Sequence, residues 1–155
     1  MGVAYTVRVI AQLILEGEIK RLLGRRKMQK GLKELTNHYI VCGFGRVGRR
    51  VAQELYARKV SFVVIDNDLP RIEQAEKDGF LFIQGDSTAD QTLLDAGIER
   101  AKALITAVAN EADGVFIVLS ARQLNPKLFI TARAESDEGK KKLLRAGANK
   151  VISPY

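Results

Sequence analysis

A short apolar strand that runs into a glycine-rich turn constrains this chain more than any other feature. Residues 38–48 read HYIVCGFGRVG, so an apolar segment ends in the pattern Gly-x-Gly-x-x-Gly. Gly43 permits a tight turn, Gly45 lets the backbone approach a phosphate, and Gly48 lets the next helix pack on the strand. The pattern predicts a strand, a turn and a helix whose N-terminus faces an anion.

A carboxylate at the end of the second apolar run strengthens this prediction. Residues 62–65 read FVVI and are followed by Asp66, which lies 23 positions after Gly43. A carboxylate about 20 residues beyond the glycine turn is typical of one that binds ribose hydroxyls. A turn that only packs a helix on a strand would not require this acid. Strand, glycines and acid together therefore predict a nucleotide site.

Length and composition limit the remaining possibilities. A chain of 155 residues is long enough for one domain with its own core. The single cysteine, Cys42, lies inside the first predicted strand, which favours a small buried side chain over a reactive thiol. We expect no signal peptide, because the first residues lack a basic region and a cleavage site. No window reaches the ~20 consecutive apolar residues of a membrane span.

The positive charge is concentrated at the N-terminus. Of the net charge of +7, residues 1–33 carry +6 and the other 122 residues carry +1. A nearly neutral globular part argues against a nucleic-acid partner. A basic arm after an apolar segment is typical of the cytoplasmic side of a membrane, although a solvated helix face would look the same.

The chain divides near Thr36 into a basic helical arm, 1–36, and a nucleotide-binding domain, 37–155. Residues 3–15 of the arm are mostly apolar, and apolar residues then recur at helical spacing. Glycines recur every seven residues, at 17, 24 and 31, and glycine weakens a helix. We therefore expect a partly helical connector that contributes nothing to the core.

Strands and helices alternate from residue 37 onward. Short apolar runs predict strands at 39–43, 61–65, 80–84, 102–107, 128–132 and 150–153. Helices are expected between them, at 46–58, 68–78, 88–96, 111–124 and 137–146, with Thr88 or Asn110 as candidate caps. This alternation predicts an α/β fold, a Rossmann-like doubly wound parallel sheet of order 3-2-1-4-5-6 with helices on both faces.

Ligands of this fold bind at the carboxyl ends of the strands. That rule selects residues after strands one to five, namely Gly43, Phe44, Gly45, Arg46, Val47, Gly48, Asp66, Asn67, Arg71, Asp86, Ser87, Thr88, Ala107, Arg133 and Glu135. Asp66 is expected to accept both ribose hydroxyls. Asp66 and Asp68 would repel a 2′-phosphate, which disfavours NADP, while Arg71 would soften that repulsion.

The sequence allows more than one role for three of these residues. Arg46 either binds a phosphate or is a surface arginine. Asp86 either contacts the adenosine end or a cation, or caps the next helix. Arg133 pairs with a phosphate, with Asp86 or with Glu135.

The groups that an enzyme of this fold requires are missing from the sequence. A dehydrogenase needs an acid–base group near its nicotinamide, yet the only histidine, His38, precedes strand one at the opposite end of the sheet. The sequence has no Tyr-x-x-x-Lys pair, no Gly-Lys-Ser/Thr phosphate loop and no Cys/His metal cluster. We therefore expect a nucleotide-binding sensor and not an enzyme, with neither catalytic nor metal-binding residues.

Several ordered motifs resemble those of one family. The chain is similar to the RCK domain, also called KTN or TrkA-N, through HYIVCGFGRVG (38–48), VID (64–66), GDST (85–88), LSARQLNP (119–126), ITARAE (130–135) and LRAGANKVISP (144–154). These motifs span residues 38–155. The arm resembles, less specifically, the end of a channel's inner pore helix with its linker.

The resemblance implies a regulatory role at the cytoplasmic face of the cell membrane. RCK domains control potassium channels and transporters, usually as a gating ring of eight domains, so it implies a homo-oligomer, at least a dimer, attached to a potassium channel pore. The chain would be the N-terminal lobe of such a domain. The alternative parent protein is a Trk/Ktr-type uptake system or a potassium/proton antiporter. A third hypothesis, separate from the resemblance, is that the chain is an NAD-dependent oxidoreductase.

The resemblance also bears on the ligand. In the calcium-gated member, the ion is bound by the acid of the strand-three Gly-Asp motif and by two acids after strand five. The matching positions here are Asp86, Arg133 and Glu135, and an arginine among the ligands opposes calcium binding. An arginine there contacts phosphate in nucleotide-binding members. We therefore expect an adenine nucleotide, NAD(H) or ATP/ADP, and a divalent-cation sensor remains an alternative.

Overall fold

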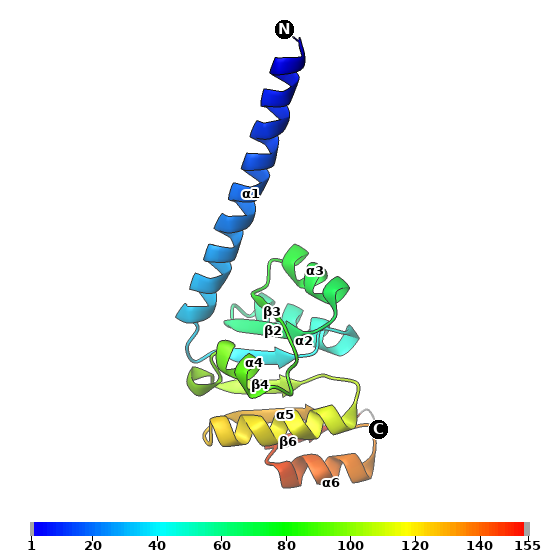
Figure 1. Cartoon of the computed structure of the whole chain (residues 1–155). Helices are drawn as coiled ribbons and strands as arrows, with labels where there is room; N and C mark the ends of the chain where they lie inside the picture. Colours follow the sequence, from blue (N-terminus) through cyan, green and yellow to red (C-terminus); the bar gives the residue numbers. More distant parts are fainter. Residues whose placement is uncertain (1, 154–155) are drawn as a thin grey trace.

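The computed structural model describes residues 2–153, which form one long helix followed by an α/β unit (Figure 1). The helix is α1 (Gly2–Glu34). The strands of the α/β unit are β1 (Tyr39–Cys42), β2 (Phe62–Asp66), β3 (Phe82–Gln84), β4 (Ala103–Thr106), β5 (Phe129–Arg133) and β6 (Lys150–Ile152). Its helices are α2 (Arg46–Ala57), α3 (Leu69–Lys77), α4 (Asp90–Asp95), the 3₁₀ turn η1 (Ile98–Arg100), α5 (Glu111–Leu124) and α6 (Asp137–Ala146).

The six strands form one parallel sheet in the order β3-β2-β1-β4-β5-β6, which confirms the predicted fold class. The two central strands are in register from Tyr39 with Ala103 to Cys42 with Thr106. The chain order reverses direction between β1 and β4, so their carboxyl ends open the crevice at which this fold binds ligands. The glycine turn after β1 lies at that crevice.

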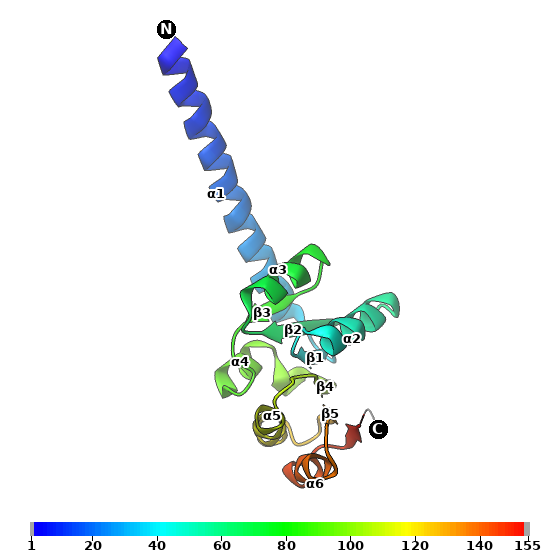
Figure 2. The ribbon, with the colours of Figure 1, turned by 90° about the vertical axis from the view of Figure 1, so that its right-hand side faces the viewer.

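Alternate side chains of the strands enter two separate cores. Val41 and Val64 pack with Ala52 of α2 and Ala75 of α3 on one face. Strand residues of the other parity pack with side chains of α4, α5 and α6 on the opposite face, among them Ile40, Leu104, Leu93, Ile117 and Leu143. Figure 2 shows the ribbons of α4, α5 and α6 on the opposite side of the sheet from α2. Because both faces are covered, the central strands β1, β2 and β4 are mostly runs of buried apolar residues.

The arm differs from its prediction, because α1 is one continuous helix of 33 residues. Glycine costs a helix about 1 kcal/mol without forbidding it, and added Cβ atoms at Gly17 and Gly24 would meet nothing within 4 Å. None of the residues of α1 is buried, but the end of the arm does reach the core, contrary to the expectation. Leu32 and the buried Leu35 fasten its end to the sheet.

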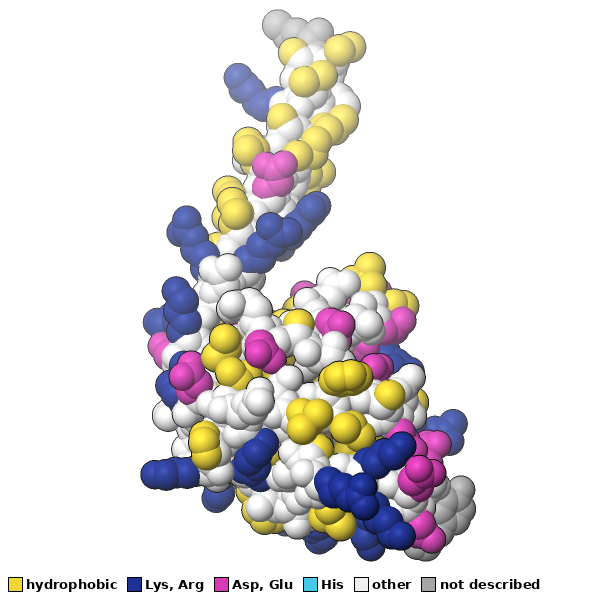
Figure 3. Space-filling view, turned by 60° about the horizontal axis from the view of Figure 1, so that its bottom comes forward, with side chains coloured by type: hydrophobic (Ala, Val, Ile, Leu, Met, Phe, Trp, Pro, Cys, Tyr) yellow, Lys and Arg dark blue, Asp and Glu magenta, His cyan; other side chains and the backbone are white. Residues whose placement is uncertain are grey.

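The outer half of α1 carries mostly hydrophobic side chains, and most of its basic residues lie nearer the α/β unit (Figure 3). Val3, Tyr5 and Leu13 are more than half exposed. Within residues 2–153, no helix has an apolar stretch long enough to cross a membrane.

One of the two predicted helix caps is correct. The Asn110 side chain accepts a hydrogen bond from the N–H of Asp113, 3.1 Å away, at the start of α5. Thr88 does not cap α4, since that helix begins after Ala89 without a side-chain cap. The backbone N–H and the hydroxyl of Thr88 instead donate to the Asp86 carboxylate. Asp86 therefore closes the turn ahead of α4 and does not cap the helix itself.

The glycine turn brings β1 and α2 into direct backbone contact. Gly43 has a φ of 96°, a conformation that strongly favours glycine, and a Cβ there would lie 3.1 Å from the backbone of Ala107 and Val108. A Cβ at Gly48 would overlap the carbonyl oxygen of Gly43. These two positions fix where the N-terminus of α2 lies.

Replacing Gly48 by alanine should destabilise the fold, because the methyl group has no space unless α2 moves away from β1. We expect a loss of about 3 kcal/mol in the free energy of unfolding, measured by urea denaturation. Gly24→Ala is the matched control, since open space surrounds Gly24 in a helix. If Gly48→Ala unfolds at the same urea concentration as the original chain, the close contact between Gly48 and Gly43 is not required for stability.

His38 should make the fold sensitive to mild acid. Its side chain is fully buried, and its Nε2 donates to the carbonyl oxygen of Ala96 at 2.7 Å. Burial lowers the pKa of His38 below its ordinary 6.5; the Ala96 hydrogen bond opposes this shift and the nearby Arg100 adds to it. The unfolded chain therefore takes up a proton first as pH falls, so this stability is present above about pH 6.5 and is lost below it.

We expect the free energy of unfolding to fall as the pH decreases below about 6.5, and His38→Gln to flatten that slope. The glutamine amide retains a donor for Ala96 and does not titrate. Urea denaturation at several pH values measures the effect. Equal slopes in the two proteins would assign the pH dependence to other groups.

Candidate functional site

The N-terminus of α2 offers unshared backbone N–H groups to a ligand. Gly45 occupies the N-cap position, and no side chain caps the helix. The first turn of α2 contains no acidic residue. Both the N–H groups and the positive end of the helix dipole are therefore available to an anion such as a phosphate.

Asp66 stands beside this helix N-terminus, at the end of β2. Its Oδ2 accepts a hydrogen bond from the backbone N–H of Phe44 at 2.7 Å, and its Oδ1 accepts from that of Asp68 at 2.9 Å. Only 6% of the residue is exposed. Two backbone donors thus fix the carboxylate at the cleft, and its remaining lone pairs can accept hydroxyl groups.

The residues that follow β3 lie at the same edge of the sheet as Asp66. Hydrogen bonds from the side chain and the backbone N–H of Thr88 lower the pKa of Asp86. Ser87, between Asp86 and Thr88, is buried. Burial raises the pKa of the Cys42 thiol to about 12, and the influence of the Ser87 side chain opposes this shift. Cys42 is therefore a buried thiol and not a nucleophile, as its position in the strand predicted.

Arg133 at the end of β5 pairs with Glu135, one of its three predicted partners, at 3.4 Å. The backbone N–H of Glu135 donates to the Glu111 carboxylate at 2.9 Å. The same carboxylate accepts from the Ser136 hydroxyl. This network holds Glu135 away from the cleft, while Arg133 lines it.

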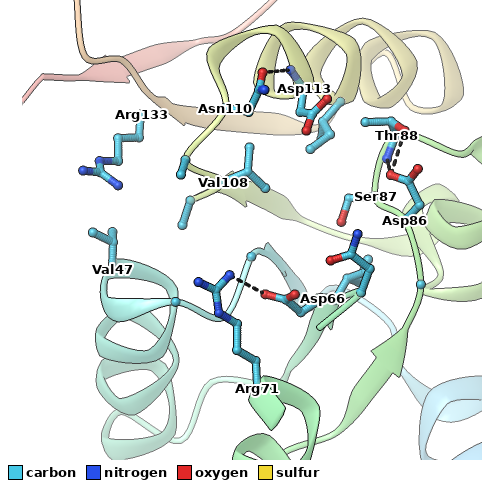
Figure 4. Close-up of a pocket in the computed structure, with 18 of the residues that line it drawn as sticks. Val47, Asp66, Arg71, Asp86, Ser87, Thr88, Val108, Asn110, Asp113 and Arg133 are labelled. Carbon is cyan, nitrogen blue, oxygen red and sulfur yellow. Dashed lines mark hydrogen bonds and ion pairs between the residues drawn. The ribbon is translucent and has the colours of Figure 1, made fainter. Parts of the chain in front are cut away.

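These groups surround one cleft of about 440 Å³ at the carboxyl edge of the sheet (Figure 4). Twelve of the fifteen predicted site residues line it: Gly43, Gly45, Arg46, Val47, Asp66, Asn67, Arg71, Asp86, Ser87, Thr88, Ala107 and Arg133. The other three do not line it. Phe44 acts through its backbone N–H, Gly48 packs against Gly43, and Glu135 pairs with Arg133.

Other lining residues were not among the predicted site residues, namely Ile65, Gly85, Val108, Ala109, Asn110, Asp113 and Ile117. Most follow β4 or begin α5. The Asn110 cap and the acidic first turn of α5 were visible in the sequence. The pairing of β1 with β4 follows from the predicted strand order, and the structure shows that it brings this helix start to the same cleft as the glycine turn.

The charges of the cleft are separated. Arg71, Arg133 and Val47 lie toward one end, and Asp86, Thr88 and Asp113 toward the other, with Asp66 between them (Figure 4). Within residues 2–153, no group of three or more His, Cys, Asp or Glu side chains is arranged to hold a metal ion. The arrangement suits an elongated ligand with an anionic end and a polar end.

Comparison with known proteins places the chain in a family. Residues 39–154 match the TrkA-N domain. Potassium channel protein 1 of Methanocaldococcus jannaschii is 44% identical over 99% of this chain, which spans 47% of that relative. The chain thus covers about half the length of this relative.

Two solved structures share both the fold and appreciable sequence. The TrkA-N domain of the inner membrane protein YbaL from Escherichia coli has a TM-score of 0.75 and 31% identity, over 78% of this chain and 90% of its own. The AMP-bound C-terminal domain of Kef from Shewanella denitrificans has a TM-score of 0.67 and 26% identity, over 76% and 70%. The family match, the relative and the folds agree with the motifs, and the chain belongs to the TrkA-N domain family.

Proposed function

We propose that this chain is a ligand-sensing regulatory domain whose cleft binds an adenine nucleotide. The observation that carries the proposal is the placing of the Asp66 carboxylate beside the uncapped N-terminus of α2. A ribose bound to Asp66 would bring its phosphate to the α2 N–H groups. The Kef domain of the same fold is an AMP-bound form, which supports this ligand class.

The residues of the chain fit such a ligand. Gly43 and Gly48 have no space for side chains, and Gly45 keeps the backbone open to the cleft. Asp86 and Thr88 would meet the adenosine end, while Arg46 and Arg133 would meet phosphates. NAD(H) and ATP/ADP share these features, so the proposal covers both. It includes no reaction, because the cleft lacks a histidine or tyrosine to move a proton.

In the whole protein, the domain would control potassium flux through a channel at the cytoplasmic face of the membrane. The match to Potassium channel protein 1 covers 99% of this chain and so includes α1. We propose that the arm links the nucleotide-binding part to the pore. Assembly as a homo-oligomer, at least a dimer and a ring of eight in the whole protein, belongs to the same proposal.

An antiporter is the second candidate parent. YbaL, named a putative cation/proton antiporter, is 32% identical over 77% of this chain. The channel is favoured because its match has both higher identity and nearly complete coverage of this chain. A chimera tests whether the parent protein is a channel. In it, this chain replaces the matching half of the M. jannaschii channel, and potassium flux in liposomes is measured with and without nucleotide. Nucleotide-independent flux would count against gating by this domain.

Asp66→Asn should weaken nucleotide binding at least about tenfold, because a neutral amide accepts hydroxyl protons less strongly than a carboxylate. Calorimetric titration with AMP, ADP, ATP, NAD and NADH measures the loss and identifies the ligand. Asp95→Asn removes an exposed carboxylate outside the cleft and is the matched control. Thermal unfolding of both variants checks that the fold is retained.

Saturable binding to the original chain that is lost in Asp66→Asn would support the proposal. Absence of binding by every nucleotide would contradict it. Equal nucleotide affinities in Asp66→Asn and the original chain would show that the nucleotide does not bind at Asp66, at the end of β2.

A further inference from the structure

Arg71 is the cleft cation whose surroundings suggest a selective role. It lies in the first turn of α3, where its backbone N–H donates to the capping carboxylate of Asp68 at 3.1 Å. The cap fixes the backbone at this point, and Pro70 beside it stiffens the helix start. The side chain then extends from α3 into the cleft with its guanidinium toward Asp66 (Figure 4).

The guanidinium lies between the predicted ribose carboxylate and the glycine turn. Its Nη1 is 3.5 Å from Asp66 Oδ2, and its Nε is 4.0 Å from Asp68 Oδ2. Its Cζ would also be 3.5 Å from a Cβ placed on Gly45. Arg71 therefore borders both the point where a ribose would bind and the start of α2, where a phosphate would bind.

Arg71 is not needed to hold Asp66 in place. Two backbone N–H groups, from Phe44 and Asp68, already orient that carboxylate at 2.7 and 2.9 Å. The Arg71 side chain is 53% exposed, and within the described residues its guanidinium forms ion pairs but no hydrogen bond. An ion pair whose arginine is half-exposed and whose atoms are 3.5 to 4.0 Å apart contributes little to stability. Its five N–H donors therefore remain available to a ligand.

The other arginines of the cleft are placed differently. Arg133 is on the opposite wall and pairs with Glu135. Arg46 is the first residue of α2, and no described contact directs its side chain toward Asp66. Arg71 is thus the arginine that lies beside Asp66 and Gly45 together.

We propose that Arg71 makes the site selective for phosphorylated adenosine by binding the 5′-phosphate next to the ribose held by Asp66. The inference rests on the proposed nucleotide-binding function and adds a specificity residue to it. A 5′-phosphate over Gly45 would lie within reach of the guanidinium. A 2′-phosphate would instead approach the Asp66 and Asp68 carboxylates, which repel it.

The test compares AMP, adenosine and 2′-AMP by calorimetric titration of the original chain, Arg71→Met and Arg71→Lys. Methionine keeps an aliphatic stem of similar reach and removes the charge. We expect Arg71→Met to weaken AMP binding about tenfold, as loss of one charge-assisted hydrogen bond would. Its adenosine affinity should stay within about twofold, and Arg71→Lys should recover part of the AMP affinity.

Arg145→Met is the matched control, because it removes an exposed arginine from α6, away from the cleft. The salt dependence of AMP binding is a second readout. It should be steeper in the original chain than in Arg71→Met, since one ionic contact is missing from the variant. Thermal unfolding confirms that each variant is folded.

Three results would overturn the role of Arg71. Equal losses for AMP and adenosine would make Arg71 a support for Asp66 and not a phosphate ligand. Unchanged AMP affinity in Arg71→Met would show that Arg71 does not contact the nucleotide. A loss confined to 2′-AMP would assign it to a 2′-phosphate. Failure of the original chain to bind AMP, ADP, ATP, NAD and NADH would instead contradict the proposed function, so the two hypotheses fail in distinguishable ways.

Discussion

The contact between the first residue of the glycine turn and the first helical turn of α2 is the constraint on which the site depends. A Cβ at Gly48 would overlap the Gly43 carbonyl oxygen, so only glycine lets α2 lie this close to β1. That approach directs the helix N-terminus at the crevice between β1 and β4. It also brings the N–H of Phe44 within 2.7 Å of Asp66. The peptide group between Gly43 and Phe44 therefore has two roles. Its oxygen is the atom against which Gly48 of α2 packs, and its N–H holds the Asp66 carboxylate.

The cleft owes its polarity to elements that are distant in sequence. Asp66 comes from β2, Asp86 follows β3, Asp113 lies on α5 and Arg133 ends β5. Parallel strands bring these ends to one edge, since every crossover returns the chain to the same starting side of the sheet. Arg71 and Arg133 thereby lie toward one end of the cavity and Asp86 and Asp113 toward the other, with Asp66 between them and paired with Arg71 (Figure 4). An elongated anionic ligand with a polar base is the kind of molecule that matches this distribution.

Much of the fold was predictable, and the errors have identifiable physical causes. Short apolar runs located all six strands, because strands covered on both faces cannot alternate with polar residues. The arm was expected to be only partly helical, yet three glycines lower helix stability without breaking the hydrogen-bonding pattern. Thr88 was a reasonable cap by residue type. The helix starts two residues later, because the Asp86 carboxylate engages both the N–H and the hydroxyl of Thr88 in a local turn.

The sequence by itself determined the alternation of strands and helices, the glycine turn and the position of Asp66, because each depends on local pattern and spacing along the chain. Only the tertiary structure decided which partners the charged side chains take. Arg133 had three possible partners and pairs with Glu135, and Arg71 lies between Asp66 and Gly45. It also showed that the start of α5 joins the cleft. Such outcomes depend on distances of a few ångströms between separate elements, which the pairing of β1 with β4 sets and residue spacing does not encode.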